Sequence, residues 1–237
     1  FRSADVYEKI IRAIASKGSG IDREELVRLT GIPSGGRLKK RLRELEEAGF
    51  IAAGTPYGYR AKNVSYRLID EYVSFYLKWI EPAPARVFRA DSADYWIAKS
   101  RTPAYRAWAG HAFEGVCLKH ARQIREALGI QSVAAETGSW RYVPEKGSSA
   151  ERGAQIDLLF DRDDGVITLC EAKYCADEFT IDKAYARDLK SKIEVFERKT
   201  GTRKQLQLVL ITMHGLKRNT WSQDLIDNVV IVEDLFR

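Results

Sequence analysis

Charged residues interrupt the alternating, strand-like sequence of residues 155–174, QIDLLFDRDDGVITLCEAKY. Asp157 comes first, and Glu171 and Lys173 follow as a Glu-x-Lys pair. The alternation predicts two β-strands with one apolar face. A charged group on such a face is costly to bury unless it is paired or binds a metal ion. The stretch therefore predicts either a solvated strand face or a functional site.

The turn between the two strands predicts which residues face each other. The DDG sequence that ends at Gly165 is a turn signal, and glycine suits the left-handed position of a three-residue hairpin loop. If the residues that flank this loop pair with each other, Asp157 lies opposite Glu171. The period of two also places Glu171 and Lys173 on one strand face. We therefore expect two carboxylates within a few ångströms of each other, with an ammonium group beside them.

Two carboxylates this close repel each other unless a cation lies between them. Mg²⁺ suits the position, because it binds one or two carboxylates and keeps waters that substrate phosphates can replace. We expect Asp157 and Glu171 to bind Mg²⁺, with Mn²⁺ as a substitute and the carbonyl oxygen of Ala172 as a further ligand. Lys173 can then position or deprotonate an attacking water, or neutralise charge on the reacting phosphate.

The alternative is an exposed strand in which Glu171 and Lys173 only meet water at a sheet edge. The residues around them favour the interior, because Leu169, Cys170 and Ala172 are types that proteins usually bury. A functional site is therefore the preferred interpretation.

The Asp…Glu-x-Lys hairpin resembles the PD-(D/E)xK phosphodiesterase superfamily, which includes restriction endonucleases, Holliday-junction resolvases and recombination nucleases. The resemblance implies a restriction-endonuclease-like mixed sheet flanked by helices, and metal-dependent hydrolysis of DNA. In that superfamily a helix before the hairpin often supplies another acid. The matching residue is Glu114, in the sequence WAGHAFEG, which would bind the metal directly or through water.

Apolar residues at helical spacing predict three helices in the first 50 residues, over 5–17, 22–31 and 34–49. Asp22 is expected to cap the second helix, and Gly31 and Gly49 to end the second and third. The segment that follows, up to residue 70, reads as two short strands around a Gly/Pro/Asn-rich loop. Three helices and a β-hairpin resemble a winged helix-turn-helix.

The third helix is strongly basic, with five Lys or Arg residues between positions 37 and 43. Arg37, Lys40 and Arg41 fall on or near one outer face. They are therefore candidate DNA contacts of a recognition helix. Two alternatives stay open: a solvated face that nearby glutamates partly neutralise, and a protein-interaction module, a role that winged helices also serve.

The remaining sequence predicts a mixed sheet flanked by helices, of the α+β or α/β class. We expect a long helix over 104–128, the hairpin described above, a helix over 180–199, and strands over 205–212 and 228–234. Lys183 opens the later helix and is a further candidate DNA contact. Tyr185 could also reach the scissile phosphate, and three more basic residues on this helix could track the DNA backbone: Arg187, Lys190 and Lys192.

An aromatic segment, EYVSFYLKWIEP, follows the predicted winged helix and is expected to join two domains. The PAPAR sequence behind it is the expected linker. We place a winged-helix domain with its aromatic bridge helix at residues 1–82, and a nuclease-like domain at residues 83–237.

A second resemblance covers essentially the whole chain. The winged helix, FYLKWI, the WxGxxFE motif at residues 108–114, QIDLLF, CEAKY and ITMHGLKRN resemble the C-terminal region of an archaeal-type AAA+ ATPase family. That family carries a P-loop ATPase before these domains. The chain has no GxxxxGK[ST] motif and begins at Phe1, so we expect it to be a fragment that does not bind ATP, with the ATPase module as a missing partner.

Composition adds weaker constraints. A net charge of +6 and a pI near 9.1 are compatible with a polyanionic partner. The three cysteines are odd in number and lack metal-ligand spacing, which fits a reduced, cytoplasmic setting. No stretch approaches the about 20 apolar residues that a membrane helix needs, so no membrane partner is expected.

The sequence thus predicts a Mg²⁺-dependent deoxyribonuclease with a winged helix that helps to grip DNA. Asp157, Glu171 and Glu114 would bind the metal ion, and Lys173 would assist the attacking water. A homodimer is expected if both DNA strands are cut. The alternative is a catalytically silent DNA-binding or protein-docking module that regulates the ATPase.

Overall fold

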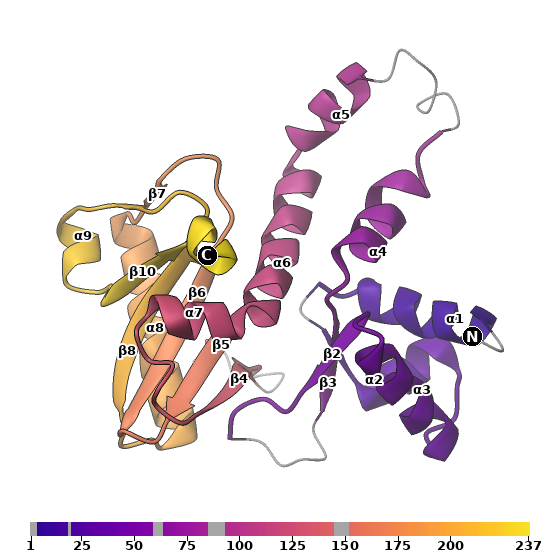
Figure 1. Ribbon diagram of the computed structural model, residues 1–237, viewed down its shortest axis with the longest axis horizontal. Coiled ribbons are helices and arrows are strands. Elements are labelled where there is room, and N and C mark those ends of the chain that lie inside the picture. The colour runs from indigo at the N-terminus through magenta and orange to yellow at the C-terminus, as the bar shows by residue number, and fades with distance from the viewer. Residues whose placement is uncertain (1–3, 19, 59–63, 85–92, 145–151) are drawn as a thin grey trace. The chain divides into compact units, whose positions relative to one another are not determined.

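The structure is a computed structural model that describes residues 4–18, 20–58, 64–84, 93–144 and 152–237 (Figure 1). The chain divides into two compact units. The first comprises Phe1–Thr55 with Ala61–Val116, and the second comprises Pro56–Arg60 with Cys117–Arg237. This division falls inside a helix and does not coincide with residue 82, so the domain boundary expected there stays a prediction.

The first unit begins with the three helices that the sequence predicts. They are α1 (Ala4–Ala15), α2 (Arg23–Thr30) and α3 (Gly36–Glu47). Asp22 caps α2, because its side chain accepts a hydrogen bond of 2.7 Å from the amide of Glu25. Gly31 ends this helix with a φ of 64°, a left-handed conformation that glycine adopts without strain. The capping signals were therefore sufficient to place the helix.

Three short strands complete this part of the first unit. They are β1 (Ile21–Asp22), β2 (Ile51–Gly54) and β3 (Ser65–Leu68), in the antiparallel order β1-β3-β2. The two strands around the Gly/Pro/Asn-rich loop are confirmed as β2 and β3, and β1 is an addition that the sequence did not predict. The helices and the sheet share one apolar core, made of Ile10, Ile14, Ile21, Leu26, Leu38, Leu42, Leu45 and Ile51.

The aromatic segment forms a cluster of rings inside the first unit. Its elements are α4 (Glu71–Phe75), a π-helix (Tyr76–Ile80), α5 (Ala93–Ser100) and the N-terminal part of α6 (Pro103–Lys119). Trp79 is buried, and its ring centroid lies 6.0 Å from those of Trp96, Tyr105 and Trp108. These rings thus pack with one another within one unit. The expected linker falls partly on residues 85–92, outside the described residues.

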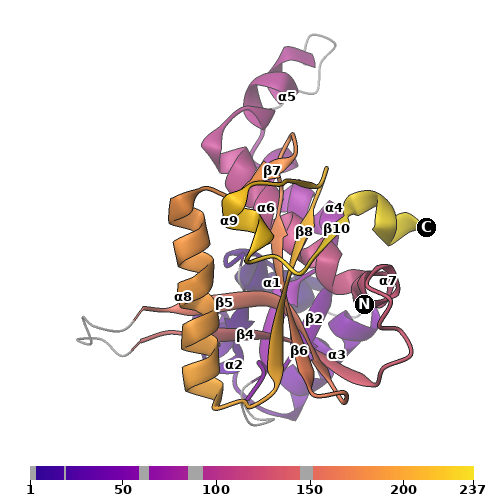
Figure 2. The same ribbon diagram turned by 90° about the vertical axis from the view of Figure 1, so that its left-hand side faces the viewer.

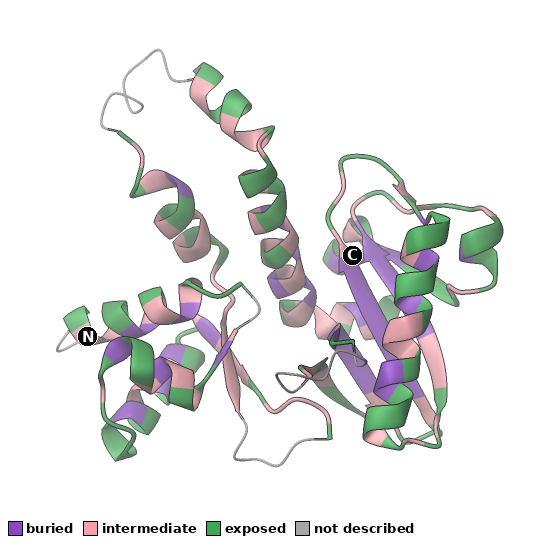
Figure 3. Cartoon of the chain, turned by 180° about the vertical axis from the view of Figure 1, so that it is seen from behind, coloured by how far each residue is buried: buried purple, intermediate pink, exposed green. Residues whose placement is uncertain are grey.

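The second unit contains a mixed five-stranded sheet, as the sequence predicts. Its order is β10-β8-β6-β5-β4, with parallel pairing from β10 to β6 and antiparallel pairing from β6 to β4. The strands are β4 (Ala135–Tyr142), β5 (Ala154–Arg162), β6 (Val166–Lys173), β8 (Gln205–Thr212) and β10 (Asn228–Ile231). Figure 3 shows that the central strands are largely buried, which suits their apolar sequences.

Helix α8 (Lys183–Thr200) lies along one face of this sheet (Figure 2). Its Leu189 and Phe196 belong to the same buried cluster as Ile167 and Leu169 of β6. The odd-numbered side chains of β6, among them Glu171, therefore lie on the sheet face that α8 covers. The smaller elements are α7 (Ala121–Ala127), β7 (Phe179–Thr180), β9 (Leu216–Lys217), α9 (Thr220–Gln223) and a 3-10 helix (Val232–Phe236).

The long helix expected over residues 104–128 is two helices, α6 and α7. His120 separates them with φ −101° and ψ 24°, outside the helical range. Its ring packs against Phe236, with centroids 5.1 Å apart. Spacing of apolar residues alone carries no signal for such a break, because both halves keep the helical period.

The β5–β6 hairpin has the predicted turn and the predicted register. Asp163–Gly165 form the loop, and Gly165 has a φ of 84°. The strands pair from Asp161–Ile167 to Leu158–Cys170. The ladder ends there, one pair before the expected pair of Asp157 with Glu171.

A bulge in β5 begins at the same place. On its other edge, β5 pairs Leu159 with Gly138 of β4 and then Ile156 with Trp140, so β5 has one extra residue between these pairs. Ile156 and Leu159 consequently belong to the same apolar cluster, although they are three residues apart. The bulge redirects Asp157 relative to a regular strand.

We predict that Gly165→Ala lowers the free energy of unfolding by about 1 kcal/mol, because an L-residue is strained at a positive φ. A Cβ at Gly165 would meet nothing within 4 Å, so backbone strain is the only cost. Gly110→Ala is the matched control: it lies within α6, also with nothing within 4 Å, and should raise stability by roughly 0.5–1 kcal/mol. Urea denaturation of both variants measures the two signs, and a stabilising Gly165→Ala would contradict the turn.

Candidate functional site

The β5–β6 hairpin holds three of the four predicted catalytic residues in the second unit. Asp157 comes from the bulge of β5, and Glu171 and Lys173 come from the end of β6. Asp157 is 7% exposed and Glu171 is 2% exposed. Two acids this well buried in an apolar sheet need compensating partners, because an isolated buried charge is strongly unfavourable.

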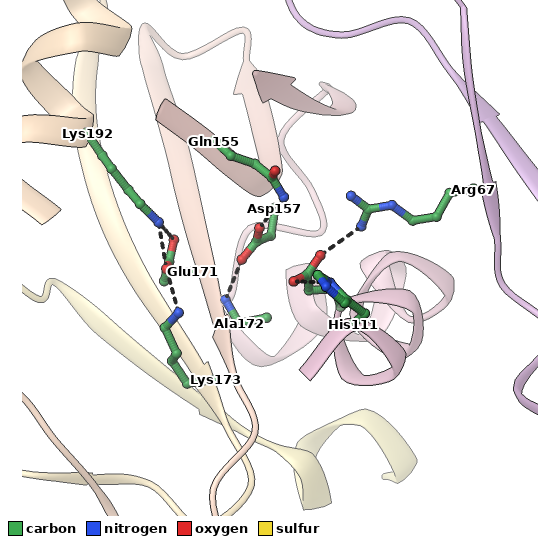
Figure 4. A network of polar contacts seen from close by, with 9 residues as sticks. Arg67, His111, Gln155, Asp157, Glu171, Ala172, Lys173 and Lys192 are labelled. Carbon is green, nitrogen blue, oxygen red and sulfur yellow. Dashed lines mark hydrogen bonds and ion pairs between the residues drawn. The ribbon is translucent and has the colours of Figure 1, made fainter. Parts of the chain in front are cut away.

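Asp157 is held by two neutral donors (Figure 4). The amide nitrogen Nε2 of Gln155 donates to Oδ1 at 3.1 Å, and the backbone amide of Ala172 donates to Oδ2 at 3.3 Å. The second bond joins the side chain of β5 to the main chain of β6 where the regular ladder has ended. Asp157 is therefore hydrogen-bonded to Ala172, the residue that follows Glu171 in β6. It does not form a strand pair with Glu171.

Glu171 is surrounded by positive charge (Figure 4). Lys192 Nζ lies 2.8 Å from each of its two carboxylate oxygens, and Lys173 Nζ lies 2.9 Å from Oε1. Burial acts to raise the pKa of Glu171, but the ammonium groups of Lys173 and Lys192 outweigh it and lower this pKa below its ordinary value. Glu171 is therefore an anion at neutral pH.

Helix α8 supplies two partners of Glu171. Tyr185 and Lys192 are seven residues apart, which places them on one face of the helix, two turns from each other. The Tyr185 hydroxyl donates to Oε1 of Glu171 at 2.9 Å, and burial and the Glu171 charge raise the pKa of Tyr185. Lys173 Nζ lies 5.2 Å from the centroid of the Tyr185 ring. Tyr185 thus stays protonated and acts as a hydrogen-bond donor.

The nearby thiol of Cys170 is not anionic. Cys170 and Cys117 are both buried, and burial raises the pKa of Cys170 well above its ordinary value, with the charge of Asp157 adding to the shift. A protonated thiol is neither a good nucleophile nor a good metal ligand. The oxygen atoms of Asp157 and Glu171 are the chemically suitable ligands in this part of the second unit.

The donor chemistry of the hairpin suits a hard divalent cation, which prefers carboxylate oxygens. Among the residues that the structure describes, no group of three or more His, Cys, Asp or Glu side chains is placed to hold a metal ion. Two buried carboxylates and two ammonium groups make the local formal charge zero. A bound cation would therefore compete with the lysines.

Glu114, the third expected ligand, belongs to the first unit. One of its carboxylate oxygens lies 3.3 Å from a guanidinium nitrogen of Arg67 on β3, and the other lies 3.3 Å from Nδ1 of His111. Its side chain is 14% exposed, so the acid on the inner side of α6 is paired, not solvated. Its role as a metal ligand stays a prediction.

The three basic residues of α3 that the sequence selects lie together. Arg37 and Lys40 are exposed, Arg41 is half-buried, and all three line one surface hollow of about 720 Å³. Glu44 also lines this hollow, and its Oε1 atom lies 3.9 Å from Nζ of Lys40. The surface is therefore basic but partly neutralised. The shared outer face is confirmed, and its contact with DNA stays a prediction.

The basic residues of α8 separate into two groups. Lys183, Arg187 and Lys190 are exposed, which leaves them accessible to a polyanion. Lys192 was expected to track the DNA backbone with them, yet here its ammonium group contacts Glu171. The sequence carries a signal for this position, because Lys192 lies two turns after Tyr185 on the face that meets the sheet.

Comparisons with known proteins assign no family. No protein-family model matches the chain, and no curated protein matches it. Among solved structures, the chain is similar to protein VC1899 from Vibrio cholerae at 12% identity and a TM-score of 0.34. The alignment covers 98% of this chain and 48% of that one, so the chain spans about half the length of its structural neighbour. In the described parts of the chain, no helix is long and apolar enough to cross a membrane.

We predict that Glu171→Gln lowers the free energy of unfolding at neutral pH by about 1–2 kcal/mol, because it removes the charge that balances two lysines. The folded pKa of Glu171 is below its ordinary 4.5, so its stabilising contribution is complete above that value. The contribution is lost as pH falls through the folded pKa. Urea denaturation between about pH 3 and pH 7 measures the free energy of unfolding as a function of pH. This free energy should change less with pH for Glu171→Gln than for the wild type.

Glu194→Gln is the matched control for this measurement. Glu194 lies on α8 and is exposed, so the same change of charge should leave stability nearly unaltered. Equal pH profiles for the wild type and Glu171→Gln would contradict the charge pairing described above.

Proposed function

We propose that this chain is a metal-dependent phosphodiesterase of the PD-(D/E)xK kind that hydrolyses DNA. One observation carries the proposal: neighbouring strands bury Asp157 and Glu171 in one unit, and Lys173 lies 2.9 Å from Glu171. Buried acids beside an ammonium group are an expensive arrangement for a purely structural strand end. Metal-assisted phosphoryl chemistry uses these groups together.

Each residue has a proposed role. Asp157 and Glu171 would hold Mg²⁺, or Mn²⁺ as a substitute, and Glu114 would add a ligand directly or through water. The bound ion would supply charge stabilisation for the reacting phosphate and a more acidic water. Lys173 would position that water or receive its proton, and the hydrogen bonds from Gln155 and Ala172 would keep Asp157 oriented.

The surrounding organisation is part of the same proposal. The helices and three-stranded sheet of the first unit would be a winged helix-turn-helix, and the five-stranded mixed sheet would be restriction-endonuclease-like. The boundary of these domains would lie after residue 82. The chain would act in the cytoplasm behind an AAA+ ATPase module, and a homodimer would allow both strands of a duplex to be cut.

We predict that Asp157→Asn and Lys173→Met each reduce Mg²⁺-dependent DNA cleavage at least about 100-fold, the usual scale for loss of a group that takes part in proton transfer or charge stabilisation. Plasmid, branched and single-stranded DNA should be incubated with the wild type and both variants, in Mg²⁺ and in Mn²⁺. Circular dichroism checks that each variant is folded.

Lys199→Met is the matched control for Lys173→Met, because Lys199 is an exposed lysine of the same unit to which no role in cleavage or DNA binding is assigned. It should cut at close to the wild-type rate. A Lys173→Met or Asp157→Asn variant that cuts as fast as the wild type would show that the assigned roles are wrong.

We predict that alanine at Arg37, Lys40 or Arg41 weakens DNA binding and lowers the salt dependence. Each phosphate contact that is lost should reduce the slope of log affinity against log salt by about 1. Fluorescence anisotropy at several salt concentrations measures both quantities.

Arg43→Ala is the control on the same helix, because Arg43 is paired with Glu47 at 2.8 Å and does not line the hollow. It should leave the slope unchanged. An equal loss in Arg43→Ala and in the three other variants would mean that net charge, and not this face of α3, governs binding.

A second candidate function is favoured by the state of Glu171, whose two oxygens are both occupied by ammonium groups. A catalytically silent DNA-binding or docking module, which regulates the ATPase, needs no vacant ligand atoms. This candidate predicts no hydrolysis of any DNA form, and DNA affinity that depends on α3 while Asp157→Asn has no effect. The cleavage and binding measurements above therefore separate the two functions.

A further inference from the structure

Lys192 lies where a cation shared by both oxygens of Glu171 would lie. Its Nζ atom is 2.8 Å from Oε1 and 2.8 Å from Oε2, so one ammonium group spans the carboxylate (Figure 4). We propose that Lys192 is a built-in counter-cation that competes with the divalent metal for Glu171 and leaves when the metal binds. This inference rests on the proposed function, because it concerns the same metal site.

Charge balance requires one of the lysines to move. With Asp157 and Glu171 counted as carboxylates and Lys173 and Lys192 as ammonium groups, the formal charges of the four side chains sum to zero. A divalent ion added to this neutral group would leave two uncompensated positive charges next to carboxylates that are almost fully buried. Repulsion between cations at such short range is much stronger inside a protein than in water.

The contacts of the two lysines indicate which one leaves. Lys173 belongs to the same strand as Glu171 and contacts one of its oxygens. Its Nζ atom also lies 5.2 Å from the centroid of the Tyr185 ring. Lys192 engages both oxygens, so it blocks every ligand atom of Glu171 at once. Its side chain is 27% exposed, close to the 31% of Lys173, so both ammonium groups have a path into water, and the contact with both oxygens is what distinguishes Lys192.

Two consequences follow for the protein without metal. Lys192 stabilises the empty site, because it neutralises an acid that would otherwise be buried without enough compensation. It also weakens metal binding, because each binding event must break the Lys192–Glu171 pair. Removal of this ammonium group should therefore tighten metal binding while it destabilises the metal-free fold.

The test is calorimetric titration of MnCl₂ into the full chain without DNA, for the wild type and for variants at position 192. Lys192→Met keeps the apolar stem and removes the charge, and should bind Mn²⁺ about tenfold more tightly than the wild type. Lys192→Arg keeps a cation beside Glu171 and should bind no more tightly than the wild type. Lys190→Met, the exposed neighbour on α8, should match the wild type.

Thermal melting without metal supplies an independent readout: Lys192→Met should melt at a lower temperature than Lys190→Met. If Lys192→Met does not fold, Lys192→Gln replaces it, because the amide can still donate to Glu171 without a charge.

The outcomes separate this inference from the proposed function. Mn²⁺ binding by the wild type with equal or weaker binding by the uncharged variant overturns the role of Lys192 and leaves the metal site in place. If Lys192→Met binds Mn²⁺ and the wild type does not, Lys192 competes strongly enough to prevent metal binding, which supports the inference. No Mn²⁺ binding by either protein overturns both the competition and the metal site.

Discussion

The ion-paired Glu171 carboxylate is the interaction on which the arrangement of the second unit's site depends. An acid at 2% exposure cannot remain ionised in an apolar sheet without compensation, and the protein provides it from two elements. Lys173 comes from the same strand, and Lys192 and Tyr185 come from α8. The position of α8 along the sheet therefore has two effects. Its inner face adds Leu189 and Phe196 to the apolar core, and it also places the ammonium group of Lys192 beside Glu171.

The bulge in β5 has the complementary effect on the second acid. In a regular hairpin, Asp157 would be the next residue to pair across from Glu171, and two anions would face each other. The extra residue in β5 ends the ladder and directs the Asp157 carboxylate to the amide of Ala172. The two acids are thus kept in neighbouring positions with separate partners, which lowers their mutual repulsion in the absence of a cation. Bulges next to functional sites commonly redirect one side chain in this way.

Local signals in the sequence predicted the local structure well. The Asp22 cap, the glycine stops and the loop that ends at Gly165 act within a few residues, so their outcome hardly depends on the rest of the fold. The mixed sheet also followed from the pattern of apolar strands. The bulge could not be predicted, because a one-residue insertion in one strand is visible only against the register of its neighbour β4. The same holds for the contact of Lys192, which depends on how α8 is rotated over the sheet, and for the break at His120.

Helix α8 also lies in the connection between β6 and β8, two strands that pair side by side in parallel. Parallel neighbours need such a crossover, whereas the β5–β6 hairpin closes over a loop of only three residues. Chain closure over a short loop is fast, and pairing across a long connection is slow. During folding, the acids would thus be brought together by the hairpin before the helix delivers the balancing lysine. In that interval the end of the hairpin carries an uncompensated negative charge and stays hydrated, which delays its burial until the crossover has docked.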